Sequence, residues 1–256
     1  MSSTASLVET LVHGHVTELR LARPPVNALN PELCHAIRES LGTAVANGAR
    51  GIVLAGGPKV FSAGLDVPFL LSLGADQAAL LKAWTAFFDA ARALATCPVP
   101  VVAAMAGHAP AGGCVLGLCC DYRIMADGPY RIGLNETQVG LVAPEGIQAL
   151  MARAVGTHRA ERLLVAGAMV DAAQALRIGL VDELTGIDDV ATRARVWLEE
   201  LQPLAQKPML ETRRIARTDV ADCLRDERID LQRFVAGWME PETQAALRAM
   251  LARIGK

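Results

Sequence analysis

Apolar and polar residues alternate with a period of two along the first part of the chain, which is typical of half-buried strands. The alternating stretches are residues 7–12 and 16–22, and they flank His13-Gly14. We therefore expect a hairpin. Asn30-Pro31 then predicts a helix start, because Asn can cap free N–H groups and Pro fits the first helical position. We expect Gly48 to end this helix.

Short apolar runs in the middle of the chain are followed by glycine-containing loops and then by helical patterns. Such runs predict buried strands. The expected strands are 51–55, 99–106 and 121–126, and the expected helices are 76–95 and 112–120, the second apolar on all sides. The first two strands lead into loops at Phe61–Asp66 and Pro110–Val115. The pattern therefore contains two strand–loop–helix units in series.

The rest of the chain is largely helical in pattern, with Gly, Pro or Asp between the segments. The expected segments begin near Pro144, Thr157, Asp171, Asp189, Lys207, Asp222 and Pro241. We divide the chain into a core of residues 1–195, which carries the site, and a C-terminal helical region of residues 196–256.

Composition adds few constraints. The chain of 256 residues is 52% hydrophobic and only 4% aromatic, so the core must consist mainly of Ala, Leu and Val. A net charge of −2 shows no bias toward nucleic acid or a membrane surface, and we expect neither as a partner. The N-terminal residues lack an export signal and no stretch predicts a membrane span, which favours a cytoplasmic protein. The six cysteines read as buried reduced thiols, and no metal site is expected.

The strip from Gly133 to Gly140 holds the most informative candidate, the carboxylate of Glu136. Its neighbours are apolar or neutral, and a desolvated carboxylate has the raised pKa that general bases exploit. Glycine loops such as the two upstream can aim backbone N–H groups at a developing negative oxygen. A carboxylate facing two such donors is suited to removing a proton next to a carbonyl. Alternatively, a lone Glu in a loop simply caps a turn.

The two loops and the Glu136 strip resemble the crotonase (enoyl-CoA hydratase/isomerase) superfamily in order and in spacing. The run from Pro110 to Ala143 looks most like the mitochondrial-type Δ3,Δ2-enoyl-CoA isomerases. This resemblance implies an α/β fold, a crotonase-like spiral of ββα units followed by C-terminal helices that mediate trimerisation. It also implies an acyl-CoA substrate, with coenzyme A as part of the substrate and no separate cofactor.

The resemblance implies a role for several residues. The N–H groups of Leu65 and Gly112 would hold the thioester oxygen, and Glu136 would carry a proton from C2 to C4. Asp66 would brace the first loop by hydrogen bonds. Trp84, Phe87 and Phe88 would border the acyl tunnel or simply belong to the core. The residues implied to contact substrate are Val26, Ala28, Ala63, Asp66 and Asn135, the first two beside the CoA nucleotide.

Val115 marks the main departure from related hydratases, which carry a second glutamate at this position. Hydration needs one carboxylate to activate water and another to deliver the α-proton, so Val115 favours isomerisation. Glu145 leaves an alternative open, because it could enter the pocket and support hydration or dienoyl isomerisation. As the residue after Pro144, it equally suits an exposed first helical turn. A non-catalytic acyl-CoA-binding or RNA-binding relative is a further alternative.

The C-terminal helices carry apolar residues at helical spacing, more than a one-sided cover for a core should need. We expect part of this surface to form an interface, and the resemblance implies a homotrimer or a dimer of trimers. Alternatively, these residues cover the protein's own core. They are Leu224, Ile229, Leu231, Phe234, Val235, Trp238, Leu247, Met250, Leu251 and Ile254.

Overall fold

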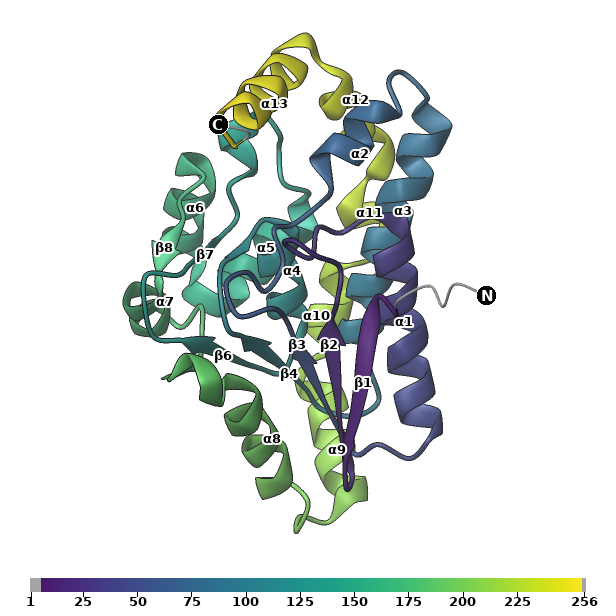
Figure 1. The fold of residues 1–256 in the computed structure, drawn as a ribbon, viewed down its shortest axis with the longest axis vertical. Coiled ribbons are helices and arrows are strands. Elements are labelled where there is room, and N and C mark those ends of the chain that lie inside the picture. Colours follow the sequence, from purple (N-terminus) through teal and green to yellow (C-terminus); the bar gives the residue numbers. More distant parts are fainter. Residues whose placement is uncertain (1–5, 255–256) are drawn as a thin grey trace.

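A six-stranded sheet forms the centre of the fold in the computed structural model, which describes residues 6–254 (Figure 1). Its strand order is β1-β2-β3-β4-β6-β9. Only β1 and β2 run antiparallel, which confirms the predicted hairpin, and every later neighbour is parallel. The strands are β1 (Val8–His13), β2 (Val16–Leu21), β3 (Gly51–Ala55), β4 (Val101–Met105), β6 (Tyr122–Ala126) and β9 (Glu183–Thr185).

The central strands are buried on both faces, as expected for parallel strands covered by helices. Successive side chains alternate between the two faces. Val53 and Ala55 of β3 pack with Ala194 and Leu198 of helix α8 (Val190–Glu200) in a small cluster. The remaining apolar residues of the sheet face the main core, which is covered by α1 (Pro31–Ala46) and α3 (Gln77–Ala95).

Helices α1 and α3 begin where their capping residues predict. The Asn30 side chain accepts a hydrogen bond from Leu33 N, and the Asp76 side chain accepts one from Ala79 N. Gly48 follows the end of α1 with a φ of 86°, a value that favours glycine. The first helix and the long second helix of the sequence prediction are therefore confirmed.

A smaller sheet, in the order β5-β7-β8, lies at the entrance to the fully buried helix α4 (Gly112–Cys119). Its strands are β5 (Ala109–Pro110), β7 (Arg131–Gly133) and β8 (Val170–Asp171). Ala111 N, at the start of α4, donates a hydrogen bond to the carbonyl of Gly133 in β7. The sheet thereby links the start of α4 to the segment that leads to Glu136. Its strands are too short to produce a pattern in the sequence.

The C-terminal half is mostly helical, as predicted. Its helices are α5 (Glu145–Val155), α6 (Thr157–Ala166), α7 (Ala172–Ile178), α8, α9 (Gln206–Ala216), α10 (Thr218–Cys223), α11 (Asp226–Ile229), α12 (Leu231–Met239) and α13 (Pro241–Ile254). The predicted start near Asp222 is wrong, because three short helices occupy this stretch. Asp230 causes one break: it has a φ of 44° and its side chain caps α12 by accepting from Arg233 N. The expected boundary at residue 195 falls inside α8.

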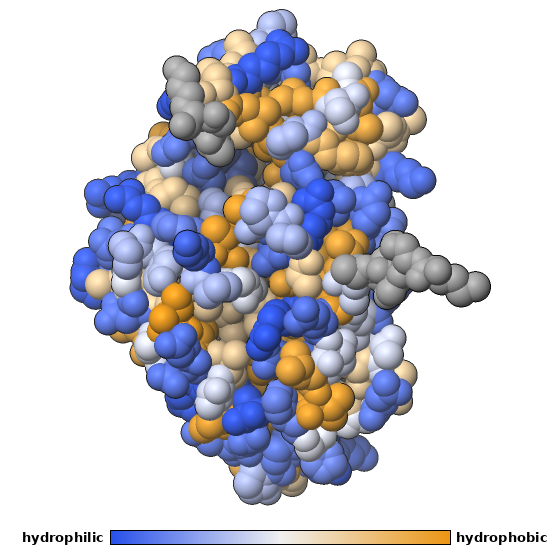
Figure 2. Space-filling model, in the orientation of Figure 1, coloured by the Kyte–Doolittle hydropathy of each residue, from blue (hydrophilic) through white to orange (hydrophobic). Residues whose placement is uncertain are grey.

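The apolar C-terminal residues mostly cover this chain's own core, so our interface argument from that pattern is wrong. Leu224, Ile229, Phe234, Val235, Trp238 and Leu247 are buried within one chain. Residues 1–5, on which part of the export-signal prediction rests, residues 255–256 and the side chain of Ile254 lie outside the described part. Figure 2 still shows hydrophobic surface gathered at the end of the molecule where α13, α12 and α2 (Val67–Ser72) lie.

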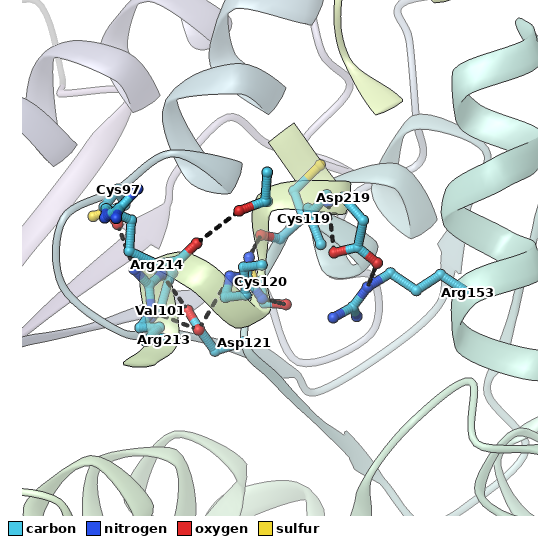
Figure 3. A network of polar contacts seen from close by, with 12 residues as sticks. Cys97, Val101, Cys119, Cys120, Asp121, Arg153, Arg213, Arg214 and Asp219 are labelled. Carbon is cyan, nitrogen blue, oxygen red and sulfur yellow. Dashed lines mark hydrogen bonds and ion pairs between the residues drawn. The ribbon is translucent and has the colours of Figure 1, made fainter. Parts of the chain in front are cut away.

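A buried ion-pair network holds α9 and α10 against the core (Figure 3). Asp121 accepts hydrogen bonds from Arg213 Nε at 2.6 Å and from Val101 N at 2.8 Å. Arg217 donates to the carbonyl oxygens of Cys119 and Cys120, where α4 ends. The Arg217 guanidinium group therefore satisfies carbonyls at the end of α4, whose other end faces the cavity described below.

All six cysteines are free and buried, in agreement with the expectation of reduced thiols. Burial raises the pKa of Cys34 and Cys119 to about 12, so both thiols stay protonated at neutral pH. Over residues 6–254, no helix combines the length and the apolar character needed to cross a bilayer.

Candidate active site

A cavity of about 620 Å³ is lined by every candidate site residue named above except Glu145. Its walls come from six stretches of the chain: residues 23–28, 63–68, 84–88, 110–115, 135–147 and 234–251. Segments that are far apart in sequence therefore meet at one place. The two glycine loops and the Glu136 strip are neighbours in space, because residues of all three line the same cavity.

The two glycine loops touch each other. A Cβ on Gly64 would lie 3.1 Å from Gly112 N, and a Cβ on Gly112 would lie 3.4 Å from Gly64 Cα. Gly64 also has a φ of 80°. On the next residue of α4, a Cβ on Gly113 would lie 2.5 Å from the carbonyl oxygen of Ser62. Glycine is required here because the two backbones approach each other without room for side chains.

This contact places two free backbone N–H groups on adjacent loops. Leu29 donates to the Gly64 carbonyl and accepts from Asp66 N, so the ladder uses the residues on either side of Leu65. Leu65 N–H consequently points to the opposite side. Gly112 is the first residue of α4, and its N–H has no partner within the helix. Within residues 6–254, neither N–H has a hydrogen-bond partner, so both can donate to a ligand oxygen.

Ala111 is a site residue that our sequence analysis missed. It has a φ of 45° and a ψ of −118°, a conformation that residues other than glycine rarely adopt. Its N–H donates to the Gly133 carbonyl, and its own carbonyl accepts from Val115 N. Both contacts hold the strained turn from which Gly112 N–H projects. Alanine is not a residue typical of turns, so the sequence contains no signal for this conformation.

Glu136 begins a short 3-10 turn, η1 (Glu136–Val139), and its carboxyl group is buried beside the cavity. Its Oε2 atom has no hydrogen-bond partner among the described residues. Desolvation by burial raises the pKa of Glu136 to about 7. No charged group contributes to this shift, and the pKa of the nearby Cys114 thiol is itself raised by burial. A carboxyl group of this kind can both accept and return a proton near neutral pH.

Val115 and Asn135 lie on the cavity wall near this carboxyl group. Val115 is 2% exposed and presents a branched apolar side chain to the cavity. The Oδ1 atom of Asn135 is buried without a hydrogen-bond partner in the described chain. Beside the Glu136 carboxyl group, the cavity therefore offers apolar surface and one uncommitted amide oxygen.

Asp66 has a structural task, as expected from the sequence. It caps α2 by accepting from Phe69 N at 3.0 Å, and it accepts from Arg23 Nη2 at 2.6 Å. Arg23 also donates to the carbonyl of Ala28. These bonds join the first glycine loop to the 23–28 segment, so Val26, Ala28, Ala63 and Asp66 all line the same part of the cavity. Helix α2 itself has too few residues to appear in the sequence pattern.

Glu145 lies outside this cavity, at the start of α5. Its side chain is 64% exposed and forms a two-bond ion pair with Arg228 of α11, with distances of 2.5 and 2.6 Å. The hydrogen bond from Arg228 lowers the pKa of Glu145. The exposed first-turn position is therefore confirmed, and the alternative in which Glu145 enters the pocket is not supported.

Aromatic residues form part of the cavity wall. Trp84 of α3 packs edge-to-face against Phe234 and Trp238 of α12, with ring centroids 4.4 and 5.9 Å apart. Phe87 and Phe88 pack edge-to-face on the same helix, with centroids 5.0 Å apart. These residues belong to the core and also line the cavity. Such a wall is suited to an apolar group rather than to a charged one.

Comparisons with known proteins agree with this arrangement. A family model described as enoyl-CoA hydratase/isomerase matches residues 12–233. Mitochondrial enoyl-CoA delta isomerase 1 of Mus musculus is 35% identical over 252 residues, which cover 97% of this chain and 86% of the mouse protein. Probable enoyl-CoA hydratase EchA17 of Mycobacterium tuberculosis is 36% identical over 186 residues, covering 70% of this chain and 68% of that protein.

The fold is shared with solved members of this family. The crystal structure of human mitochondrial delta3-delta2-enoyl-CoA isomerase matches with a TM-score of 0.91 at 32% identity, covering 97% of this chain and 98% of the human one. An enoyl-CoA hydratase/isomerase family protein from Pseudomonas syringae matches with a TM-score of 0.81 at 27% identity, covering 89% and 98%. The α/β crotonase fold and the family are thereby confirmed: this chain belongs to the enoyl-CoA hydratase/isomerase family.

Proposed function

We propose that this protein is a Δ3,Δ2-enoyl-CoA isomerase, which converts a 3-enoyl-CoA into the trans-2-enoyl-CoA in fatty acid β-oxidation. The observation that carries the proposal is the single uncommitted carboxyl group of the cavity. The Oε2 atom of Glu136 is buried without a hydrogen-bond partner in the described chain, and burial raises the pKa of this carboxyl group to about 7. The similarity to named delta isomerases over 97% of the chain supports the same choice.

In the proposed reaction, the thioester oxygen accepts hydrogen bonds from the N–H groups of Leu65 and Gly112. The Glu136 carboxylate removes a proton from C2, and the electron pair moves through C1 to give a dienolate whose oxygen these N–H groups stabilise. Loss of one donor of this kind typically costs ~2.7–4 kcal/mol in the transition state. The protonated Glu136 then delivers the same proton to C4, and the double bond moves to C2–C3.

The rest of the cavity fits an acyl-CoA thioester. Val26, Ala28, Ala63 and Asp66 surround the end that would hold the CoA portion, and Asn135 adjoins the reacting carbons. The apolar wall of Trp84 and the α12 residues would receive the acyl chain. The site requires no further cofactor for this proton transfer, because Glu136 supplies and recovers the only proton that moves.

Hydration is the second candidate, since EchA17 carries the name of a hydratase. The described cavity walls contain one other carboxylate, that of Asp66, which is occupied by Arg23 and Phe69 N. Val115 stands at the position of the second hydratase glutamate. A water molecule would therefore lack the second base that its activation requires, which is why we favour isomerisation.

The direct test incubates the purified protein with 3-hexenoyl-CoA and follows the absorbance of the conjugated enoyl thioester. Crotonyl-CoA, assayed in parallel, reports hydration as loss of the same absorbance. We expect rapid isomerisation and little hydration, and we expect Glu136→Gln to lose at least about 10²–10⁴-fold in turnover. Hydration as fast as isomerisation, or a Gln variant that keeps a tenth of the activity, would contradict the proposal.

We also propose a homotrimer or a dimer of trimers, on the strength of the family resemblance. Exposed large apolar side chains among residues 6–254 include Val142, Val165, Leu176 and Ile215. Val165 of α6 and Val142 are 75% and 71% exposed. Light scattering at micromolar concentration tests the assembly, and a mass of 27.1 kDa, that of one chain, would refute it.

A further inference from the structure

Helix α13 contacts the turn that carries Glu136 through one buried polar residue. Thr243 is 2% exposed and lies in the first turn of α13. Its hydroxyl donates a 2.7 Å hydrogen bond to the carbonyl of Gly140, a residue 103 positions earlier in the chain. A threonine in a helix commonly bonds to its own preceding turn. Here the hydroxyl instead bonds to a different segment.

Gly140 ends the turn η1 and is shaped for this contact. It has a φ of 72°, and a Cβ there would lie 3.1 Å from Thr243 Cα. Within the turn, Gly140 N donates to the Thr137 carbonyl and Leu141 N donates to the Glu136 carbonyl. The Gly140 carbonyl takes no part in these turn bonds, and it accepts the hydrogen bond from the Thr243 hydroxyl.

The turn is also held by the end of α6 and by Gly167, the residue that follows this helix. Thr137 Oγ1 donates to the carbonyl of Leu164 at 3.2 Å, and Gln138 Nε2 donates to the carbonyl of Gly167 at 2.8 Å. A Cβ on Gly167 would lie 2.6 Å from Thr137 Oγ1. The turn is therefore fixed between two elements. The Thr243 hydroxyl forms the hydrogen bond that links it to α13, the helix that also lines the cavity with Leu247, Met250 and Leu251.

We propose that Thr243 is a positioning residue, which fixes the η1 turn through Gly140 and thereby aims the Glu136 carboxyl group and keeps water from it. This inference rests on the proposed isomerase function. Loss of the hydroxyl would let α13 separate from the turn, which would both displace the carboxyl group and hydrate it. A displacement of about 1 Å can cost about a hundredfold in rate.

The test compares Thr243→Val, which keeps the shape and removes the hydroxyl, with Thr243→Ser, which keeps the hydroxyl. For Thr243→Val we expect kcat to fall roughly tenfold to a hundredfold with little change in KM, and for Thr243→Ser we expect kcat to recover. Thr96→Val is the matched control, because Thr96 Oγ1 donates an equally long bond, 2.7 Å, to the Arg92 carbonyl at the exposed end of α3.

A second readout does not depend on activity. The titration of Glu136 can be followed by infrared difference spectra between each protein and the same protein carrying Glu136→Gln. In Thr243→Val the apparent pKa should fall from about 7 toward the ordinary value of 4.5, because water reaches the carboxyl group. Burial and the Glu136 charge both raise the pKa of the Cys114 thiol, so this thiol stays protonated over the range. Thr96→Val should leave the pKa unchanged.

The outcomes separate the two proposals. If the wild-type protein shows no isomerase activity but Thr243→Val still lowers the pKa of Glu136, the function is wrong and the positioning role stands. The positioning role is overturned if Thr243→Val lowers activity without moving this pKa. It is also overturned if kcat does not recover in Thr243→Ser. Should Thr243→Val not fold, Gly140→Ala tests the same contact from the other side, and wild-type kcat and pKa there would also overturn it.

Discussion

Gly64 and Gly112 lie in direct contact, and a Cβ on Gly64 would stand 3.1 Å from both Gly112 N and the Cβ of Ala111. The contact brings together two loops that are separated by more than forty residues. It also places the unpaired N–H groups of Leu65 and Gly112 side by side, which is the feature on which the proposed stabilisation of the thioester oxygen depends.

Replacement of Gly64 by alanine should therefore impair catalysis more than folding. The added methyl group would push the loops apart, and the φ of 80° would add strain. We expect kcat to fall by about 10²-fold or more, as when one such donor is lost. Gly42→Ala is the control, because a Cβ there meets nothing within 4 Å. This control should keep full activity and gain about 0.5–1 kcal/mol in stability.

The pH dependence of kcat/KM should show an acid limb with a midpoint near pH 7. The carboxylate form of Glu136 is the base, and burial raises its pKa to about 7. Activity is accordingly lost as the pH falls through this value and the carboxylate becomes protonated. Initial rates in buffers from pH 5 to pH 9 at constant ionic strength would measure this limb. A midpoint near 4.5 would show that a hydrated carboxylate is the base.

The same group should make the fold less stable at high pH. In the folded state the pKa is about 7 and in the unfolded chain it is near 4.5, so the folded state binds more protons between these values. Stability therefore decreases as the pH rises through this window, by about 3 kcal/mol for the full shift. Glu136→Gln removes the effect. The free energy of unfolding of this variant should be larger than that of the wild type at pH 8, and the difference should vanish near pH 4.

Glu145→Ala should leave isomerisation unchanged. The carboxylate is exposed and paired with Arg228, away from the proposed site. The variant should also leave any residual crotonyl-CoA hydration unchanged, which distinguishes this prediction from the alternative in which Glu145 is a second base. Loss of hydration in this variant alone would show that the loop before α5 moves into the cavity during turnover.

Asp121→Asn should destabilise the protein without a direct effect on the chemistry. Asp121 is surrounded by Arg213, Arg217 and Val101 N, and the three side chains are about nine-tenths buried. Breaking a buried ion pair of this kind typically costs ~3–5 kcal/mol. Denaturant unfolding would measure the loss. Glu211→Gln, which breaks the exposed pair with Arg214 on the same helix, should have little effect.

The main elements of the fold could be predicted because their signals are local. Asn30 and Asp76 cap helices by hydrogen bonds that span three residues, and the glycine loops are visible as sequence letters. Glu136 could be singled out because its neighbours are uncharged. These features need no knowledge of what lies across the cavity.

The features that escaped prediction depend on contacts between distant segments. Ala111 adopts a positive φ only because Gly133 and Val115 hold it, and Thr243 is an ordinary helical threonine until Gly140 is placed against it. The fate of the apolar residues on α12 was misjudged for the same reason. Their pattern shows that one face is buried, but it does not show whether the chain itself or a second copy covers that face.

Val115 has a consequence for the order of reactions in which the proposed isomerase takes part. A trans-2-enoyl thioester is a substrate for hydration, so a site that could perform both steps would convert its own product before release. The apolar side chain at this position separates the two steps. In the proposed reaction the product would leave as the conjugated thioester, and a separate hydratase would add water to it. In this proposal, Val115 is the reason why isomerisation and hydration would be carried out by two separate enzymes.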